Sequence, residues 1–312
     1  MSTLALFGAS GATGTVIAQA LDAAGISYRV VGRSRAALEK TFGASPLAEI
    51  VTWNPDDPAS VRAAAADVDT IVYLVGVPYN HFELHPVVMR ATLDGAIAAG
   101  VKRMLLLGTV YVYGRPQTPL VDESHPRNPH TFKGRMRKAQ EDLLFEADAA
   151  GRIKGTVLRV PDFFGPNVTN SLVYDIFLAA KNNRRANVIG PIDTPHQYVY
   201  VPDLSPVAVA LAREDRAYGR AWNFAGPGTI TQREFARLVF EQAGHEPKLT
   251  VANKTMLRVL GLFNPLMREL VEMNYLQSDP VNLDDRALHE LLPDLRATPY
   301  PEAIAQTLSA MA

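Results

Sequence analysis

The sequence has no cysteine among its 312 residues. This absence excludes disulfide bonds, cysteine-ligated zinc, iron–sulfur clusters and thiol nucleophiles. Charge of one sign is not in excess either, because 31 Lys and Arg residues stand against 32 Asp and Glu residues, for a formal net charge of −1. A protein that neutralises many phosphates normally carries a basic surplus, so we expect no nucleic-acid partner.

Long hydrophobic runs are missing as well. No stretch reaches the ~20 apolar residues that span a bilayer, and the most apolar segment, Met256–Leu270, is interrupted by Arg258, Gly261, Pro265 and Arg268. The N-terminal segment MSTLALFGAS has no basic residue, and its apolar run is too short for a secretory signal. We therefore expect a cytoplasmic protein with no membrane partner.

What is present is an ordinary globular composition, with 47% hydrophobic and 20% charged residues. Up to Val160, short continuous apolar runs alternate with helical patterns, which indicates a parallel sheet covered on both faces. The expected strands are Leu4–Phe7, Tyr28–Val31, Ala48–Trp53, Thr70–Val75, Arg103–Leu107 and Thr156–Val160. The expected helices are Thr13–Ala24, Arg35–Phe42, Ala59–Ala66, Phe82–Ala99 and Lys133–Ala150.

The rhythm changes after Pro161, where loops lengthen and helices dominate. Short strands are expected at Asn187–Ile189, Gln197–Val201 and Ala221–Phe224, and helices at Thr231–Ala243, Thr255–Leu270, Asp284–Leu292 and Pro301–Met311. We interpret residues 1–165 as a sheet domain to which 196–225 return. Residues 166–195 and 226–312 are expected to form a smaller, discontinuous, mostly helical cap that binds the substrate.

A glycine-rich turn, Gly8-Ala-Ser-Gly11-Ala-Thr-Gly14, follows the first strand and opens the first helix. Gly8 permits a tight turn, Gly11 lets the backbone approach a pyrophosphate, and Gly14 lets the helix pack closely on the strand. The helix N-terminus adds unpaired N–H groups and the positive end of its dipole. A lone glycine triplet is weak evidence, but this one has the required strand–turn–helix context. It predicts a Rossmann-type, doubly wound α/β fold that binds a dinucleotide.

The end of the second strand bears on the choice of coenzyme. An acidic residue there would bind the adenosine ribose hydroxyls, but the sequence has Arg33 and Arg35 instead. Their guanidinium groups suit a 2′-phosphate, although two solvated arginines at a helix start are the alternative. We therefore expect NADP(H) in preference to NAD(H).

Several later motifs join the glycine turn in one pattern. They are VKR at 101–103, LLLGT at 105–109, VYG at 112–114, LRVP at 158–161, FGP at 164–166, YVYVPDL at 198–204 and NFAG at 223–226. Together they resemble the extended and atypical short-chain dehydrogenase/reductase superfamily, in its epimerase/dehydratase-like branch. The resemblance covers most of the first 245 residues and implies a Rossmann domain with a substrate cap.

The resemblance also implies roles for individual residues. Thr109 matches the catalytic Ser/Thr position, and Asn54 stands where the family usually has an Asp that contacts adenine. The implied cofactor contacts are Gly8, Ser10, Gly11, Ala12, Thr13, Gly14, Asn54, Val75, Gly76 and Pro161. The residues expected along the substrate are His81, His85, Tyr113, Phe163 and His196.

The chain departs from the family at its catalytic pair. No Tyr-x-x-x-Lys occurs between residues 115 and 160; Lys133 stands in the tyrosine position and Arg137 in the lysine position. These two can polarise a carbonyl or bind an anion, or form a solvated cationic face. His196 and Gln197 stand where nucleotide-sugar enzymes usually have an arginine, which puts such a substrate in doubt.

Tyr111 is a second candidate for the missing acid. If the period-two alternation of the fifth strand continues, Tyr111 shares the side of Thr109. The alternative is an aromatic residue packed beside Tyr113. Other polar residues are weaker candidates: His81 and His85 lack a third ligand for a metal, so none is expected, and Asp162 is a loop carboxylate without a clear partner.

These observations favour an NADP(H)-dependent oxidoreductase that reduces a carbonyl of a small apolar or aromatic molecule without the usual tyrosine. A catalytically silent NADP(H)-binding sensor is one alternative, and an epimerase or dehydratase with retained cofactor is another. The apolar stretch 261–275 is either a lid over a hydrophobic substrate or cap core. The resemblance also suggests a homodimer.

Overall fold

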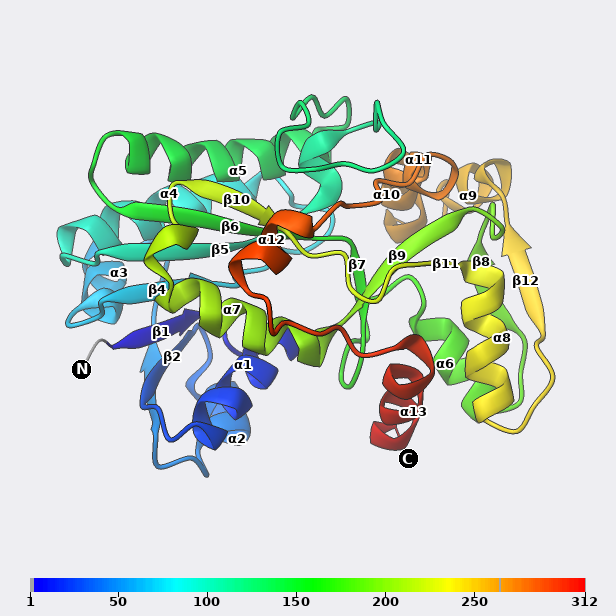
Figure 1. Cartoon of the computed structure of the whole chain (residues 1–312), viewed down its shortest axis with the longest axis horizontal. Helices are drawn as coiled ribbons and strands as arrows, with labels where there is room; N and C mark the ends of the chain where they lie inside the picture. The colour runs from blue at the N-terminus through cyan, green and yellow to red at the C-terminus, as the bar shows by residue number, and fades with distance from the viewer. Residues whose placement is uncertain (1–2, 264, 312) are drawn as a thin grey trace.

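Seven parallel strands form the central sheet, in the order β10-β6-β5-β4-β1-β2-β3 (Figure 1). The structure is a computed structural model that describes residues 3–263 and 265–311. The strands are β1 (Leu4–Phe7), β2 (Tyr28–Gly32), β3 (Ala48–Thr52), β4 (Thr70–Tyr73), β5 (Arg103–Thr109), β6 (Lys154–Val160) and β10 (Arg220–Asn223). The predicted Rossmann-type α/β fold is confirmed.

The central strands are apolar on both faces. Leu6 of β1 pairs with Val30 of β2 on one side and with Val72 of β4 on the other. Phe7 points to the opposite face and packs edge-on against Trp53, with ring centres 5.1 Å apart. A sheet that is apolar on both faces needs a layer of helices on each.

Two layers of helices meet this need (Figure 1). On one face, α1, α2 and α7 pack around a core that includes Leu6 and Val30; on the other, α3, α4 and α5 pack around Phe7, Met89 and Leu144. These helices are α1 (Ala12–Ala23), α2 (Arg35–Phe42), α3 (Pro58–Ala65), α4 (Leu84–Ala98), α5 (Phe132–Ala149) and α7 (Leu204–Arg213). The short 3₁₀ turns are η1 (Val110–Tyr113), η2 (Val201–Asp203) and η3 (Asp215–Ala217).

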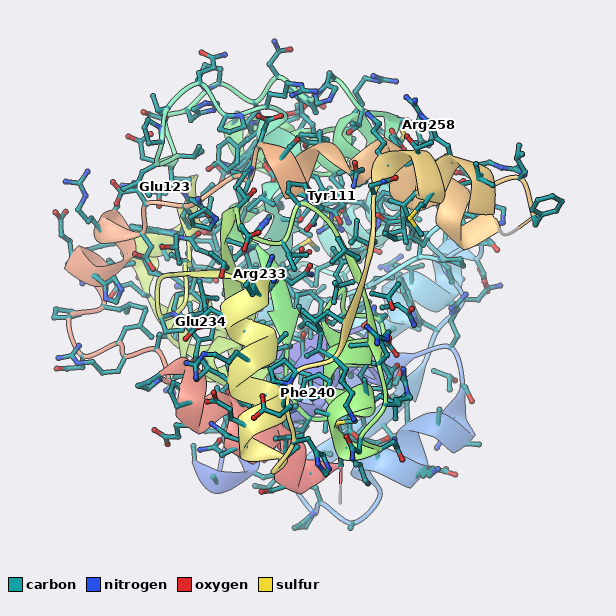
Figure 2. The ribbon with its side chains drawn as sticks, turned by 90° about the vertical axis from the view of Figure 1, so that its right-hand side faces the viewer. Tyr111, Glu123, Arg233, Glu234, Phe240 and Arg258 are labelled. Carbon is teal, nitrogen blue, oxygen red and sulfur yellow. The ribbon has the colours of Figure 1, made fainter. Side chains whose placement is uncertain are left out.

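A smaller cap continues from the end of β6. Its core is aromatic, with Phe164, Phe177, Tyr198, Phe235 and Tyr300 in mutual contact, and Figure 2 looks onto this end with α8 in front. Its strands are β7 (Asp162–Phe164), β8 (Ala186–Ile189), β9 (Pro195–Tyr200), β11 (Thr229–Thr231) and β12 (Leu249–Ala252). Its helices are α6 (Tyr174–Lys181), α8 (Gln232–Gln242), α9 (Lys254–Leu260), α10 (Pro265–Met273), α11 (Tyr275–Ser278) and α13 (Tyr300–Ala310). The helix α12 (Arg286–Leu291) packs instead against the core of the main sheet.

The structure differs from expectation in the second half of the chain. Of the segment 196–225, α7 and β10 return to the main sheet, whereas β9 pairs with β7 and β11 in a separate sheet. The helix expected over 255–270 is two helices, α9 and α10, because α9 ends at the C-cap residue Gly261. None of the described helices is long and apolar enough to cross a membrane.

Candidate active site

The turn between β1 and α1 uses its three glycines in different ways. Gly8 has φ +84°, and a Cβ there would lie 2.8 Å from the backbone of Val75. A Cβ on Gly14 would lie 2.2 Å from the carbonyl oxygen of Ala9. Gly11 differs, because a Cβ there would meet no described atom within 4 Å. Gly8 and Gly14 therefore serve the packing of the protein itself, whereas Gly11 keeps space open beside the helix.

The N-terminus of α1 is open in the same region. Gly11 is its N-cap residue, no described side chain caps the helix, and no acidic residue lies in its first turn. Such an end offers N–H groups and the positive end of a dipole to an anion. Ser10, Ala12 and Thr13 lie in this turn, as predicted. The donors and the space beside Gly11 fit the pyrophosphate of a nicotinamide dinucleotide.

The residues expected at the adenosine end follow β2 and β3. Arg33 is exposed, and no carboxylate of the described residues forms an ion pair with it. Arg35 is paired with Glu39, one helical turn further on, at 3.3 Å. The side-chain oxygen of Asn54 accepts a hydrogen bond from the N–H of Asp56 at 3.1 Å and closes the turn before α3. Arg33 is thus freer than Arg35 to receive a phosphate.

The loop after β4 passes the glycine turn. Val75 lies against Gly8, and a Cβ on Gly76 would meet no described atom within 4 Å, so this loop also leaves space near the turn. His81 lies further along, is exposed, and pairs with Glu83 at 3.0 Å. Of the predicted residues of this loop, Val75 therefore lies at the glycine turn, whereas His81 lies on the surface and is paired with Glu83.

Arg137 and His85 form a pair between α5 and α4. The guanidinium Nη1 lies 3.2 Å from Nδ1 of His85, and Nη2 donates to the carbonyl oxygen of Leu107 at 2.9 Å. Burial, with a further contribution from the charge of Arg137, lowers the pKa of His85 to about 2, so its ring is neutral. Within the described residues, no group of three or more His, Asp or Glu side chains is arranged to hold a metal ion.

Lys133, in the first turn of α5, has an almost fully buried side chain. Its ammonium group binds the carboxylates of Glu269 and Glu272 on α10, the second at 2.9 Å. It also lies 5.0 Å from the ring centre of Tyr79 and 5.6 Å from that of Phe82. Glu272 in addition accepts the backbone N–H of Lys133 at 3.2 Å. Lys133 is thus no part of a solvated cationic face but is enclosed by aromatic rings and carboxylates.

Tyr111 lies in the same group, though not for the predicted reason. The strand β5 ends at Thr109, which is half-buried, and Val110–Tyr113 form the 3₁₀ turn η1, so the period-two alternation stops before Tyr111. Its ring stacks on Phe82, with centres 6.4 Å apart. Its hydroxyl is close enough to that of Tyr79 for each to shift the pKa of the other. Burial raises the pKa of Tyr111 well above its ordinary value.

Tyr113 was expected along the substrate, but its side chain lies buried in the protein. It is 1% exposed, and its hydroxyl donates to Oδ1 of Asn223 and accepts from Nη1 of Arg159, both at 2.8 Å. Arg159 in turn forms an ion pair with Glu141 at 2.7 Å. We call these four residues the buried polar network. The hydroxyl of Tyr113 both donates and accepts a hydrogen bond inside this network, so it has no free donor for a substrate.

The other predicted residues lie at the junction with the cap. Pro161 is buried between β6 and β7, and Phe163 packs against the core shared by α1 and α7. His196 is buried in the cap, with its ring centre 6.0 Å from that of Tyr198. Burial lowers its pKa to about 4. Phe163 and His196 therefore have packing roles in the described structure, not contacts with the Lys133 group.

Sequence reasoning left out several members of the group around Lys133. Glu269 and Glu272 lie more than 130 residues away in the chain, and no local pattern joins them to α5. The sequence did give a partial signal in the apolar stretch 261–275, whose polar positions include both glutamates. Tyr79 and Phe82 lie between β4 and α4. Their closeness to Tyr111 could be inferred only from the fact that β4 and β5 are adjacent in the sheet, which brings the segments after these two strands together.

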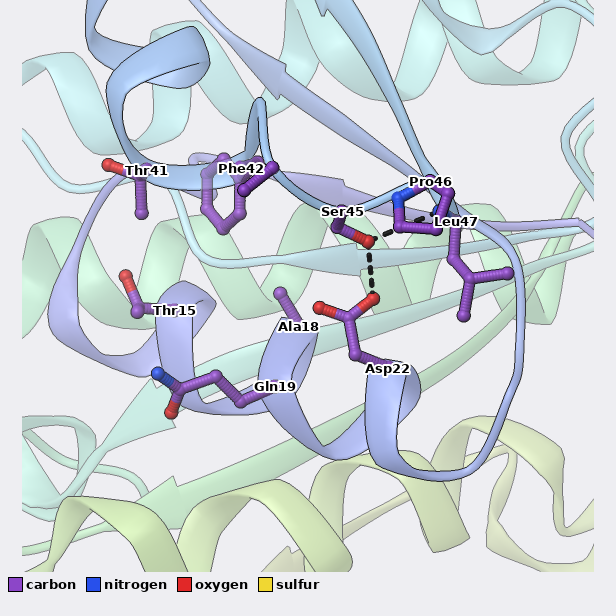
Figure 3. A pocket seen from close by; sticks show the side chains of 10 residues that line it. Thr15, Ala18, Gln19, Asp22, Thr41, Phe42, Ser45, Pro46 and Leu47 are labelled. Carbon is purple, nitrogen blue, oxygen red and sulfur yellow. Dashed lines mark hydrogen bonds between the residues drawn. The ribbon is translucent and has the colours of Figure 1, made fainter.

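The groove shown in Figure 3 lies away from this group. It has a volume of about 450 Å³ and runs along α1, opposite the loop before β3. The carboxylate of Asp22 points into it but is already bonded to Ser45 at 2.6 Å and to the hydroxyl of Tyr28 at 3.0 Å. We therefore assign no function to this groove.

Comparison with known proteins identifies the family to which this chain belongs. Residues 4–225 match the profile of the NAD dependent epimerase/dehydratase family. The chain belongs to this family. A dTDP-6-deoxy-L-talose 4-dehydrogenase (NAD(P)(+)) from Kitasatospora kifunensis is 27% identical over 262 residues, which cover 79% of this chain and 81% of that protein. A UDP-glucose 4-epimerase from Rhizobium leguminosarum bv. trifolii is 27% identical over 128 residues, or 36% and 39% of the two chains.

Solved structures of epimerase/dehydratase proteins show the same fold. A dTDP-glucose 4,6-dehydratase from Streptomyces venezuelae, with NAD and TYD bound, superposes with a TM-score of 0.81 at 16% identity, over 99% of this chain and 96% of that one. The enzyme WbmH from Bordetella bronchiseptica, in complex with NAD+, has a TM-score of 0.78 at 19% identity, over 100% and 98% of the two chains. Relatives of this chain thus bind nicotinamide coenzymes and are enzymes, so an enzyme is the expected class here.

Proposed function

We propose that this protein is an NADP(H)-dependent oxidoreductase that reduces the carbonyl group of a small apolar or aromatic molecule. One observation carries the proposal: the open end of α1 follows β1, and the next two strands on one side of β1, β4 and then β5, lead into Tyr79, Phe82 and Tyr111. In open parallel sheets, ligands bind beyond the carboxyl ends of the strands where the strand order reverses, as it does between β1 and β4.

Different residues of the site would have different roles in such a reaction. Bound NADPH would supply the hydride, as nicotinamide coenzymes do. The turn from Gly8 to Gly14 would hold the pyrophosphate. The stacked rings of Phe82 and Tyr111, with Tyr79 edge-on to Phe82, would offer apolar contacts to the substrate. The direct test is to incubate the protein with NADPH and a broad panel of aldehydes and ketones. Steady loss of absorbance at the NADPH band supports the proposal, and no loss with any of them overturns it.

The preference for NADP(H) rests on Arg33. We expect Arg33→Ala to weaken NADPH binding by about ten- to a hundred-fold while NADH binding stays unchanged, because a hydrogen bond to a charged group contributes about 1.5–3 kcal/mol. Isothermal titration of both coenzymes measures the ratio. Arg35→Ala is the matched control, since Arg35 is already paired with Glu39. Equal affinities of wild-type protein for the two coenzymes would contradict the preference and leave the dinucleotide site intact.

Lys133 gives a test of the substrate side. We expect Lys133→Met to reduce turnover by about tenfold or more. The ammonium that stands here in the position of the family's tyrosine is lost, and two carboxylates are left without their cation. Coenzyme affinity should not change. Lys138→Met, on the same helix and paired with Asp142 at 2.6 Å, is the control. A Lys133→Met protein with normal turnover would show that Lys133 has no part in the reaction.

An epimerase or dehydratase with retained cofactor is the second candidate, because relatives of the chain include a UDP-glucose 4-epimerase and dTDP-glucose 4,6-dehydratases fold alike. The two candidates differ in redox balance. A reductase consumes NADPH in proportion to product, whereas an epimerase or dehydratase forms product with no net change in coenzyme. Following coenzyme absorbance and product together separates them.

A further inference from the structure

Asp162 is a carboxylate for which the described structure gives no partner. It is the first residue of β7, at the point where the chain leaves β6 of the main sheet and enters the cap. Among the described residues, no hydrogen bond or ion pair reaches its side chain, although it is only partly exposed. Aspartate is rarely buried without a partner in proteins, so this position calls for an explanation beyond packing.

Three tyrosines, Tyr79, Tyr111 and Tyr198, lie near Asp162. It stands beside Tyr198 in the pairing of β7 with β9, and its charge reaches the hydroxyls of Tyr79 and Tyr111. Among the charged groups near these residues, Glu269 and Glu272 act on Tyr79, and both are paired with Lys133. His196 lies against Tyr198 from the same strand.

The alternatives to Asp162 as a proton donor are weak. The high pKa of Tyr111 makes it a poor acid near neutral pH. The ammonium of Lys133 is bound by two carboxylates. Burial raises the pKa of Asp162 from 3.8 to about 6. A residue that acts as both general acid and general base is most effective when its pKa lies near the working pH.

We propose that Asp162 is the catalytic acid and base of this site, in the role that a tyrosine has in the family. This inference rests on the proposed function. Bound coenzyme would supply a hydride to the carbonyl carbon of the substrate. The carbonyl oxygen takes the proton of the Asp162 carboxyl group, so that an alcohol forms. The O–H bond of the carboxyl group breaks in this step, and water returns a proton to the carboxylate. In the reverse direction the carboxylate removes the proton from the alcohol.

The test compares Asp162→Asn with wild-type protein on the carbonyl that wild type reduces fastest. We expect kcat to fall by about 10²- to 10⁴-fold, with coenzyme affinity unchanged, and the ionisation near pH 6 to disappear from the pH profile. Formate should restore part of the activity of Asp162→Ala, because it supplies the lost carboxyl group. Asp94→Asn, an exposed aspartate on α4, is the matched control and should behave as wild type.

Thermal stability provides a readout that needs no turnover. In the folded protein the carboxyl group holds its proton more tightly than in the unfolded chain, so stability falls as pH rises from about 4 to about 6 and the loss is then constant at higher pH. Asp162→Asn should therefore melt at a higher temperature than wild type at pH 8 and at the same temperature at pH 4. A residue that merely held the cap in place would lower the melting temperature at both.

The outcomes separate the two proposals. If wild-type protein reduces no carbonyl, the proposed function fails and the role of Asp162 fails with it. If wild type is active and Asp162→Asn keeps its turnover and pH profile, the role of Asp162 is overturned and the proposed function stands. If Asp162→Asn is inactive and also less stable at pH 8, the residue is structural and the inference is again overturned. Loss of turnover with a higher melting temperature at pH 8 supports it.

Discussion

Replacing Glu141 by alanine is expected to lower the free energy of unfolding by about 3–5 kcal/mol, the usual cost of leaving one partner of a buried ion pair alone. Glu141 and Arg159 are only 1% and 3% exposed, and three hydrogen bonds join them, the shortest at 2.7 Å. Without the carboxylate, the guanidinium stays buried with Tyr113 as its remaining partner in the network. Urea denaturation followed by circular dichroism measures the change.

Two further variants establish that the charge, and not the helix, is responsible. Glu146→Ala lies on the exposed side of α5 and should change stability by less than about 0.5 kcal/mol. The double replacement Glu141→Leu, Arg159→Met removes both charges and should regain most of the loss, because apolar substitutes for a buried pair are often tolerated. If Glu141→Ala is as stable as Glu146→Ala, the buried polar network does not support the fold as described.

Gly11→Val is expected to weaken coenzyme binding by about a hundred-fold or more while leaving the fold nearly unchanged. No atom of the residues that the structure describes lies within 4 Å of a Cβ at this position, and its φ of −80° suits any residue. A cost of only about 1 kcal/mol is therefore expected at this N-cap. A bound pyrophosphate would have to occupy the same space, and displacing it removes hydrogen bonds to a charged group that contribute about 1.5–3 kcal/mol each. Titration calorimetry and thermal melting measure the two effects separately.

Gly14→Ala is the contrasting variant in the same turn. A Cβ at Gly14 would overlap the carbonyl oxygen of Ala9, at 2.2 Å, so this change should lower stability itself, along with coenzyme binding. Wild-type coenzyme affinity in Gly11→Val would refute the placement of the dinucleotide at this turn, whatever the behaviour of Gly14→Ala.

Much of the fold was predictable because its central strands are short, continuous apolar runs. The expected strand Leu4–Phe7 and helix Arg35–Phe42 match the structure at both ends, and most other boundaries differ by one or two residues. The cap was harder. The strand β7 has only three residues, too few for a pattern, and β9 belongs to the cap sheet because Asp162 and Tyr198 pair across a stretch that local sequence does not join.

The candidate site was predictable only where its residues lie close together in the sequence. The glycine turn is local in sequence, so its three glycines fall where the motif requires. Lys133 and Tyr111 were named as candidates, but their partners on α10 and before α4 come from distant segments. The surroundings of Tyr113 could not be predicted from the motif in which it stands. Its hydroxyl partners, Asn223 and Arg159, come from distant parts of the chain that this motif does not include.

The coenzyme side and the substrate side of this site are built from separate stretches of chain. The turn at 8–14 and Arg33 lie in the first two strand–helix units, whereas the group around Lys133 draws on the loop after β4, on η1 and on α10. The two sides of the site can therefore be altered independently by protein engineering. Under the proposed function, grafting or randomising these loops and α10 would alter the choice of substrate and leave the coenzyme-binding turn unchanged.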